Sequence, residues 1–165
     1  MFSQLENLAF ELRLFGIKAN AQRRCEAVSS DNLHPAEVIR LLLEDEKLAR
    51  REAAAKRMVA QARFRNACHL EDWDSTYDRG LSKAKFKELA LLRFYHKMEN
   101  LIILGKTGVG KTHLGIALGN RICREANSTL FFSANLFFEE VQAEKVAGTY
   151  LKFIKKLAKT RALIL

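Results

Sequence analysis

One eight-residue segment constrains the fold of this chain more than any other. Residues 105–112 read Gly-Lys-Thr-Gly-Val-Gly-Lys-Thr, with the apolar run 101–104 before them and a helical pattern over 113–126 after them. Glycines permit the backbone torsions that turn successive N–H groups toward one point, and a helix N-terminus adds partial positive charge there. The order therefore predicts a strand, a phosphate-binding loop and a helix.

Within this loop, individual side chains have predicted roles. Lys111 would contact the β- and γ-phosphates of a nucleotide, and the Thr112 hydroxyl would ligate Mg²⁺. His113, in the first turn of the helix, favours a structural role over a catalytic one. The alternative is a glycine-rich turn with a solvated lysine. The predicted nucleotide-binding residues are Gly105, Lys106, Thr107, Gly108, Val109, Gly110, Lys111, Thr112 and His113, with Thr112 as the metal ligand and no catalytic residue assigned.

Composition bounds the remaining possibilities. The 165 residues are 48% hydrophobic and 28% charged, which predicts a globular domain plus an extension with a real core. No stretch reaches the roughly 18 apolar residues of a membrane helix, and the N-terminus MFSQLENLAF lacks a signal-peptide pattern. We therefore expect a cytoplasmic protein without membrane contact. Three widely spaced cysteines, Cys25, Cys68 and Cys123, predict reduced packing thiols.

The charge balance points to a polyanionic partner. The formal net charge is +9, and basic surfaces attract phosphate backbones by steering and counterion release. DNA bound without sequence preference is the expected partner. The alternative is a solvated helix face partly paired with acidic neighbours. The basic cluster comprises Lys47, Arg50, Arg51, Lys56, Arg57, Arg63 and Arg65.

The first 65 residues predict an all-helical docking region. Leucines at helical steps indicate a first helix that Gly16 would close as its C′ residue, and 19–28 form a second. Pro35 suits the first turn of a third helix, which continues to about Phe64. A polar linker over 66–81 follows, and Ser82 would cap the next helix.

Residues 82–165 predict the nucleotide-binding module. Strands are expected at 100–104, 129–132 and from Ala162 onward. The helices expected between and around these strands cover 82–95, 111–126, 135–147 and 149–158. Alternation of strands and helices is typical of an α/β fold with a parallel sheet.

Taken together, these residues resemble a known family. The chain is similar to the IstB-like helper ATPases of bacterial insertion sequences, relatives of the helicase loader DnaC within the AAA+ class. The resemblance extends from near Met1 to Leu165. It is carried by Leu12–Ile17, Ala62-Arg63-Phe64, Leu70-Glu71-Asp72-Trp73-Asp74 and above all the stretch Glu99–Leu114.

The resemblance implies an ATP- and Mg²⁺-dependent, DNA-binding homo-oligomer that assists a transposase. It implies that the helical N-terminal region docks partners. It also places Trp73 where it could approach adenine, although an interdomain packing role is the simpler interpretation.

The C-terminal residues depart from the family pattern. A complete member continues from the strand at 161–165 into Asp-Asp or Asp-Glu, then a polar sensor residue and an arginine that acts across the subunit interface. This sequence carries none of them there, so we expect a chain truncated before the Walker B position, which binds ATP but hydrolyses it poorly.

The same departure affects the expected sheet. In the AAA+ strand order, both neighbours of the loop-bearing strand would lie beyond residue 165. We therefore expect a partial AAA+ core with an incomplete parallel sheet, in which 101–104 face a gap or pair with 162–165 instead.

Two further interpretations stay open. One is a shortened DnaC-like replication protein whose partner is a helicase. The other is a non-enzymatic nucleotide-binding interaction module. Neighbouring genes distinguish the IstB-like from the DnaC-like interpretation, since a neighbouring transposase gene favours the former and a replication operon the latter.

Overall fold

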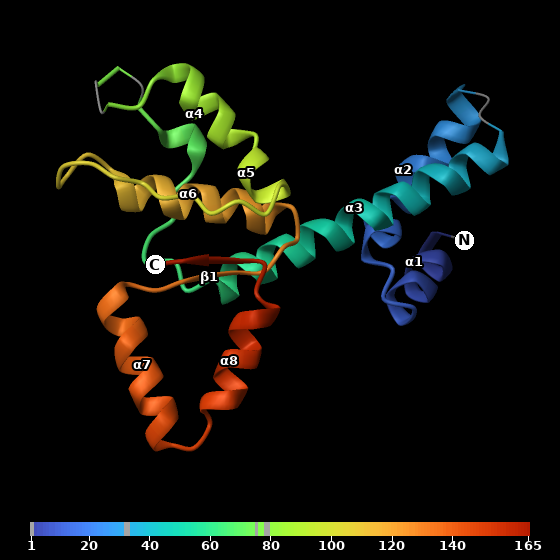
Figure 1. Ribbon diagram of the computed structural model, residues 1–165. Helices are drawn as coiled ribbons and strands as arrows, with labels where there is room; N and C mark the ends of the chain where they lie inside the picture. The colour runs from blue at the N-terminus through green and yellow to red at the C-terminus, as the bar shows by residue number, and fades with distance from the viewer. Residues whose placement is uncertain (1, 32–33, 75, 78–79) are drawn as a thin grey trace. The chain divides into compact units, whose positions relative to one another are not determined.

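The computed structural model describes residues 2–31, 34–74, 76–77 and 80–165 (Figure 1). The described chain is mostly helical, with a small parallel two-stranded sheet, as expected for a partial P-loop NTPase α/β fold. It forms two compact units, Met1–Ala54 and Ala55–Leu165. Within the described ranges, no helix is both long and apolar enough to cross a membrane.

The helices and strands follow one another in a simple order. The first unit contains α1 (Phe2–Glu11), α2 (Phe15–Asp31) and most of α3 (Pro35–Gln61). The second contains the end of α3 and then η1 (Leu70–Asp72), α4 (Lys83–Ala90), α5 (Arg93–His96), α6 (Lys111–Arg124), β1 (Thr129–Phe131), α7 (Ala134–Val146), α8 (Tyr150–Lys159) and β2 (Ala162–Ile164).

Gly16 corrects one expectation of the first unit. It does not close the first helix, because α1 ends at Glu11 and Arg13 takes the left-handed φ of 56° in the turn. Gly16 instead lies in the first turn of α2, against α3. A Cβ at this position would lie 2.4 Å from the carbonyl oxygen of Asp45 and 2.6 Å from Cα of Glu46. The glycine is therefore required by a close approach between backbones.

Glu46 explains why the two helices meet at that point. Its buried carboxylate accepts hydrogen bonds from the backbone N–H groups of Gly16 (2.7 Å) and Ile17 (3.4 Å), at the N-terminus of α2. Arg50 donates to its other oxygen at 2.6 Å. Burial alone raises the pKa of Glu46, but Arg50 and the two N–H groups together hold that pKa below its ordinary value. The carboxylate thus satisfies N–H groups that a helix start leaves without partners.

A second acidic side chain ties α2 to α3 nearby. Arg24 donates to both carboxylate oxygens of Asp45, at 2.8 and 2.9 Å. The hydrogen bond to Arg24 is the main reason why the pKa of Asp45 lies below its usual range. The two adjacent carboxylates, Asp45 and Glu46, therefore hold α2 on α3 through paired, hydrogen-bonded charges rather than isolated ones.

The second unit is built around α6. One side of this helix packs against a cluster that includes Leu89 and Leu92, from the region of α4 and α5. Ile116 and Ala117 pack with Phe131 of β1 and with Cys68. The helix is buried along most of its length because it lies between these two layers.

The sheet confirms two of the three expected strands. β1 and β2 run parallel with Thr129, Leu130 and Phe131 opposite Ala162, Leu163 and Ile164. The N–H of Phe132 extends the pairing by donating to the carbonyl oxygen of Ile164 at 2.9 Å. α7 and α8 form the crossover, as parallel pairing requires a long connection. They pack against the sheet through Phe132 and Phe153.

The prediction of a strand at 100–104 is wrong. These residues belong to neither strand of the described sheet, and the substitute pairing with 162–165 does not form either, since β2 pairs with β1. The alternating pattern survives: Leu101 and Ile103 pack on the α6 core, whereas Ile102 and Leu104 are 79% and 87% exposed. A strand needs a neighbour for its backbone groups. No described segment supplies one here.

Hydrogen exchange tests this arrangement. We expect the amides of 101–104 to exchange at loop-like rates, because no ladder protects them. Those of 129–131 and the middle of α6 should exchange at least about a hundredfold more slowly. Strong, uniform protection of 101–104 in a dilute monomer would contradict the unpaired state.

The predicted helix over 82–95 divides into two. Ser82 is its N-cap as expected, since its hydroxyl accepts from the N–H of Lys85 at 3.2 Å. Leu92 takes a left-handed φ of 53° between α4 and α5. Leu92 is 1% exposed and packs in the core beside α6, so burial of this leucine accompanies the break in the helix.

The division between the units lies inside α3, whereas the sequence predicts domains at 1–65 and 82–165 with a linker at 66–81. The residue that follows α3 is tied to the second unit, since the carbonyl oxygen of Ala62 accepts from the N–H of Phe131 at 2.9 Å. Part of the expected linker also packs on α6, where the side-chain amide of Asn120 donates to the carbonyl oxygen of Cys68 at 3.2 Å.

Candidate nucleotide-binding site

The glycine-rich loop lies directly before α6. Gly108 and Gly110 have φ values of 82° and 93°, which residues with a Cβ rarely adopt. Gly110 is the N-cap of α6, and its carbonyl oxygen accepts from the N–H of Leu114 at 2.9 Å. The two glycines therefore fold the loop back at the N-terminus of a fourteen-residue helix, where anions are favoured.

Lys111 reaches back over this loop. Its ammonium group donates to the carbonyl oxygens of Gly105 at 2.9 Å and Lys106 at 2.7 Å. Neutral carbonyls are weaker acceptors for an ammonium group than phosphate oxygens are. A phosphate chain can therefore replace them, and the cation already lies beside the loop that would hold it.

Thr112 follows on the first turn of α6 and is exposed. Its hydroxyl is accessible for a metal ion bound beside the phosphates. The loop conformation, the lysine and this hydroxyl together fit a Mg²⁺-nucleotide. The roles of residues 105–113 in nucleotide binding stay predictions, since the fit concerns the protein groups alone.

His113 and Trp73 pack together at the side of the loop. The Trp73 ring stacks on Phe86 with centroids 5.6 Å apart, and its centroid lies 6.1 Å from that of His113. Nε2 of His113 is buried and has no hydrogen-bond partner among the described residues. Both residues thus help to connect the first turn of α6 with the segment after η1, and contact of Trp73 with adenine stays a prediction.

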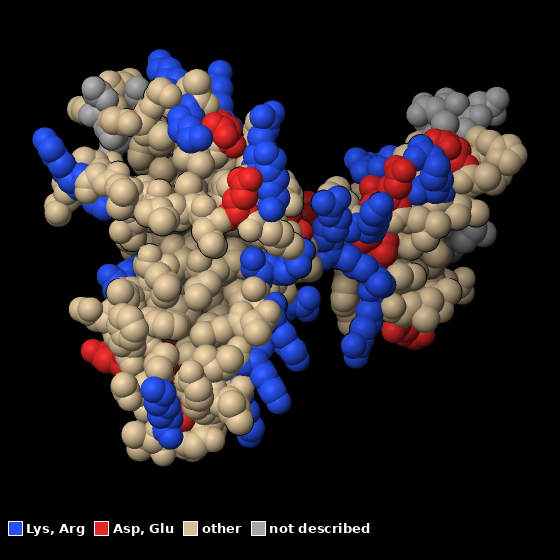
Figure 2. All heavy atoms as spheres, in the orientation of Figure 1, with Lys and Arg blue, Asp and Glu red and all other residues tan. Residues whose placement is uncertain are grey.

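The expected basic cluster separates into paired and unpaired members. Arg50 pairs with Glu46, and Arg63 pairs with Glu140. The other five are exposed and have no acidic partner in the part of the chain that the structure describes: Lys47, Arg51, Lys56, Arg57 and Arg65. Figure 2 shows basic side chains crowded over α3, with acidic ones between them. Pairing with acidic side chains thus accounts for Arg50 and Arg63. DNA binding by the other five stays a prediction.

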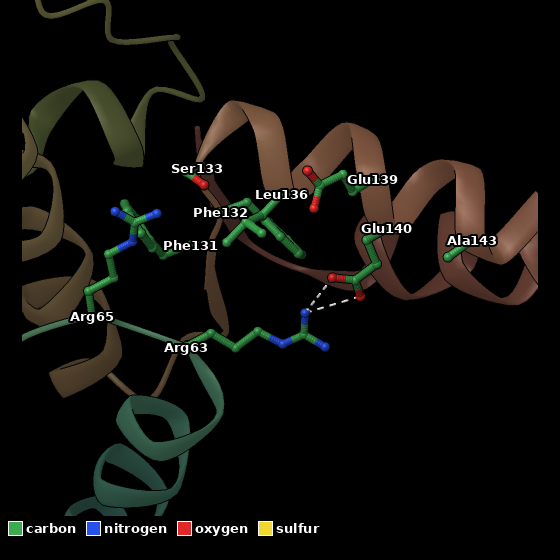
Figure 3. Close-up of a pocket in the computed structure, with 9 residues that line it drawn as sticks. All are labelled: Arg63, Arg65, Phe131, Phe132, Ser133, Leu136, Glu139, Glu140 and Ala143. Carbon is green, nitrogen blue, oxygen red and sulfur yellow. Dashed lines mark hydrogen bonds and ion pairs between the residues drawn. The ribbon is translucent and has the colours of Figure 1, made fainter.

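Sequence reasoning missed two concave surfaces of the second unit. The first, of about 410 Å³, lies at the carboxyl end of β1, where Phe131 and Ser133 line it together with one side of α7 from Leu136 to Ala143 (Figure 3). Arg63 reaches across to Glu140 with N–O distances of 2.7 and 3.0 Å, while Arg65 lies beside Phe131. The positions of Arg63 and Arg65 just after a helix gave no signal of this cavity.

Comparison with known proteins gives a consistent result. A family model described as IstB-like ATP binding protein matches residues 7–165. A Pseudomonas aeruginosa protein of insertion sequence IS21, named as ATP-binding, is 29% identical over 162 residues, covering 98% of this chain and 61% of the relative. A similarly named protein of insertion sequence IS1162 from Pseudomonas fluorescens is 31% identical over 157 residues, covering 94% and 68%.

A third relative, from an insertion sequence of Mycobacterium tuberculosis, is 29% identical over 161 residues, which cover 98% of this chain and 64% of that protein. The chain thus spans between 61% and 68% of the length of these three curated relatives.

Proposed function

Because this chain belongs to the IstB-like ATP-binding protein family, we propose that it binds ATP with Mg²⁺ through residues 105–112 and serves as the helper protein of a transposase. One observation supports this most directly: the Lys111 ammonium lies over a loop that two glycines of positive φ fold back at the N-terminus of α6. The relatives named as ATP-binding proteins support the choice of nucleotide.

Each group of the loop has a defined task in this proposal. Backbone N–H groups of the loop and the start of α6 hold the phosphates, and Lys111 neutralises part of their charge. The Thr112 hydroxyl holds the metal ion. Bound ATP would supply the differential binding energy by which such a helper changes its affinity for partners.

The metal contribution can be tested by titrating a fluorescent ATP analogue with Mg²⁺ and with chelator. We expect tighter binding with Mg²⁺ in the wild type, and no such difference in Thr112→Val, because that variant loses the hydroxyl ligand. Thr107→Val, in the same exposed loop, should keep the Mg²⁺ dependence. Absence of binding by the wild type, or an unchanged Mg²⁺ effect in Thr112→Val, would count against the proposed site.

DNA is the proposed polyanionic partner. The net charge of +9 and the exposed, unpaired cations of α3 support it, since they can displace counterions from a duplex. Arg50 is left out of this surface because its guanidinium pairs with the buried Glu46. The transposase and the homo-oligomer remain proposals that rest on the family alone.

The DNA proposal predicts a measurable salt dependence. Joint replacement of Arg51, Lys56 and Arg57 by Gln should lower the slope of log affinity against log salt by up to about 0.9 for each phosphate that the protein no longer neutralises. Fluorescence anisotropy of a labelled duplex over a salt series measures it. Replacing three exposed lysines of α8, Lys152, Lys155 and Lys156, is the matched control. Equal slopes in the wild type and the α3 variant would indicate that these three cations form a solvated helix face and do not contact DNA.

Hydrolysis is proposed to be slow in the 165-residue polypeptide. β1 leads into Phe132 and Ser133, so this strand delivers no carboxylate at its carboxyl end. Alignment of Mg²⁺ and of the attacking water in P-loop ATPases uses such carboxylates.

A further inference from the structure

A second concave surface of the second unit has no role in the proposed ATP site. It lies between the end of α3, the following segment to His69, and α6, and its volume is about 610 Å³. Clefts of this volume bind small organic ligands. Residues 105–112 do not contribute to its lining. We call it the basic cleft, after Lys56, Arg63, Arg65 and Arg124 on its walls.

The charged side chains that line the basic cleft all belong to Lys or Arg. Its lining includes these four cations and no carboxylate. Arg63 and Arg124 are paired with Glu140 and Glu71, which lie outside the lining. Lys56 and Arg65 are exposed and have no acidic partner among the described residues. Two uncompensated cations in one concave surface favour an anionic ligand.

A hydrogen-bond network builds one wall of the cleft. Nδ1 of His69 lies 2.9 Å from Nη2 of Arg124 and 3.2 Å from the amide nitrogen of Asn120. A guanidinium can only donate, so Nδ1 of His69 is the acceptor in this contact. Asn120 is 4% exposed and also donates to the carbonyl oxygen of Cys68. This buried amide therefore positions His69, and His69 in turn contacts Arg124.

The remainder of the lining is apolar. Val59 and Ala60 present a hydrocarbon surface, and Phe64 is packed against α6, where a Cβ on Gly119 would lie 3.0 Å from its Cζ. Asn66 adds an exposed amide with both donor and acceptor groups. Cations, a hydrocarbon surface and an amide together match a phosphate joined to a sugar and a base.

We propose that the basic cleft binds a nucleoside phosphate, with its phosphate held by Lys56 and Arg65 and its nucleoside against Val59 and Ala60. This site goes beyond the proposed ATP site, since it lies outside residues 105–112. The same chemistry has two sources, a free mononucleotide and a nucleotide unit of a nucleic acid strand.

The experiment uses the full chain carrying Lys111→Ala, so that the phosphate loop does not contribute. Calorimetric titrations with AMP, with inorganic phosphate and with a short single-stranded oligonucleotide are compared. We expect AMP or the oligonucleotide to bind more tightly than inorganic phosphate. Adding Lys56→Gln and Arg65→Gln should weaken that binding about tenfold or more, because these substitutions remove two charge-assisted hydrogen bonds to the phosphate.

The control adds Lys152→Gln and Lys155→Gln instead, which remove the same charge from exposed positions on α8 and should leave the affinity unchanged. Binding of AMP supports the free nucleotide as the source, and binding of the oligonucleotide alone supports a strand. Failure of every probe to bind, or an equal loss of affinity in the control, overturns the proposal. ATP binding by the wild type and by Lys111→Ala is measured in a separate experiment. A failure of the ATP proposal is therefore distinguished from a failure of the proposal for the basic cleft.

Discussion

Replacing Lys111 by Ala should weaken ATP binding by at least about tenfold, and up to about a hundredfold, because a hydrogen bond to a charged group contributes roughly 1.5–3 kcal/mol. Among the described residues, this ammonium donates hydrogen bonds to two loop carbonyls, those of Gly105 and Lys106. Its removal should therefore leave the fold intact. Titration of a labelled ATP analogue measures the affinity, and circular dichroism checks the helices.

Lys106→Ala is the matched control for this variant. Lys106 belongs to the same loop, carries the same charge and is exposed, and only its backbone carbonyl takes part in the contact with Lys111. We expect its replacement to change the affinity by less than the Lys111 substitution. Equal affinities of the wild type and the Lys111 variant would remove the main support for the ATP site.

Replacing Gly16 by Ala should strongly destabilise the first unit. The added Cβ would meet the backbone of α3 at 2.4 Å, and backbone atoms cannot move aside as a flexible side chain can. Overpacking of this kind costs about 1–3 kcal/mol. Separation of the helices would also break the bond from Gly16 to the buried Glu46 carboxylate, which is worth about 1.5–3 kcal/mol. The sum is a large part of a domain stability of about 5–15 kcal/mol.

Hydrogen exchange of the whole chain localises this effect. Protection should fall in α1, α2 and the first turns of α3, whereas α6 should keep its protection. The control is Gly115→Ala, which adds the same atom at an ordinary contact distance of 3.6 Å from Ile164. Alanine is also the better helix former by about 1 kcal/mol, so this variant should be neutral or stabilising. Unchanged protection in Gly16→Ala would show that α2 can shift away from α3 without cost.

The attachment of the phosphate loop differs on its two sides. After the loop, α6 is anchored by Leu114, Ile116 and Leu118, all buried. In the segment 101–104 before the loop, Leu101 and Ile103 contact the core, and they do so without a backbone ladder to the described strands. The position of Lys111 and Thr112 therefore depends on α6, whereas Gly105 is attached to the less extensively packed segment 101–104. The exposed Ile102 and Leu104 leave an apolar edge that invites association with other chains.

Local signals in the sequence determined much of this protein. Pro35 begins α3 and Ser82 caps α4, because fixed φ and a hydroxyl acceptor act within one turn of the chain. The glycine-rich loop stands before α6, and the apolar runs at 129 and 162 form strands. Each of these features depends on neighbours along the chain, which a sequence displays directly.

Only the tertiary structure decided the remaining features, because each depends on residues distant in sequence. The chain at 101–104 has the composition of a strand, yet strand formation required a partner that the described residues do not place beside it. Gly16 follows a leucine-rich helical pattern and so predicts a helix end. In the structure it lies in the first turn of α2, where the backbone of α3 passes too close for a side chain. The basic cleft joins residues near 60 with residues near 120, and it exists because the segment after α3, with Phe64 and Cys68, packs on α6.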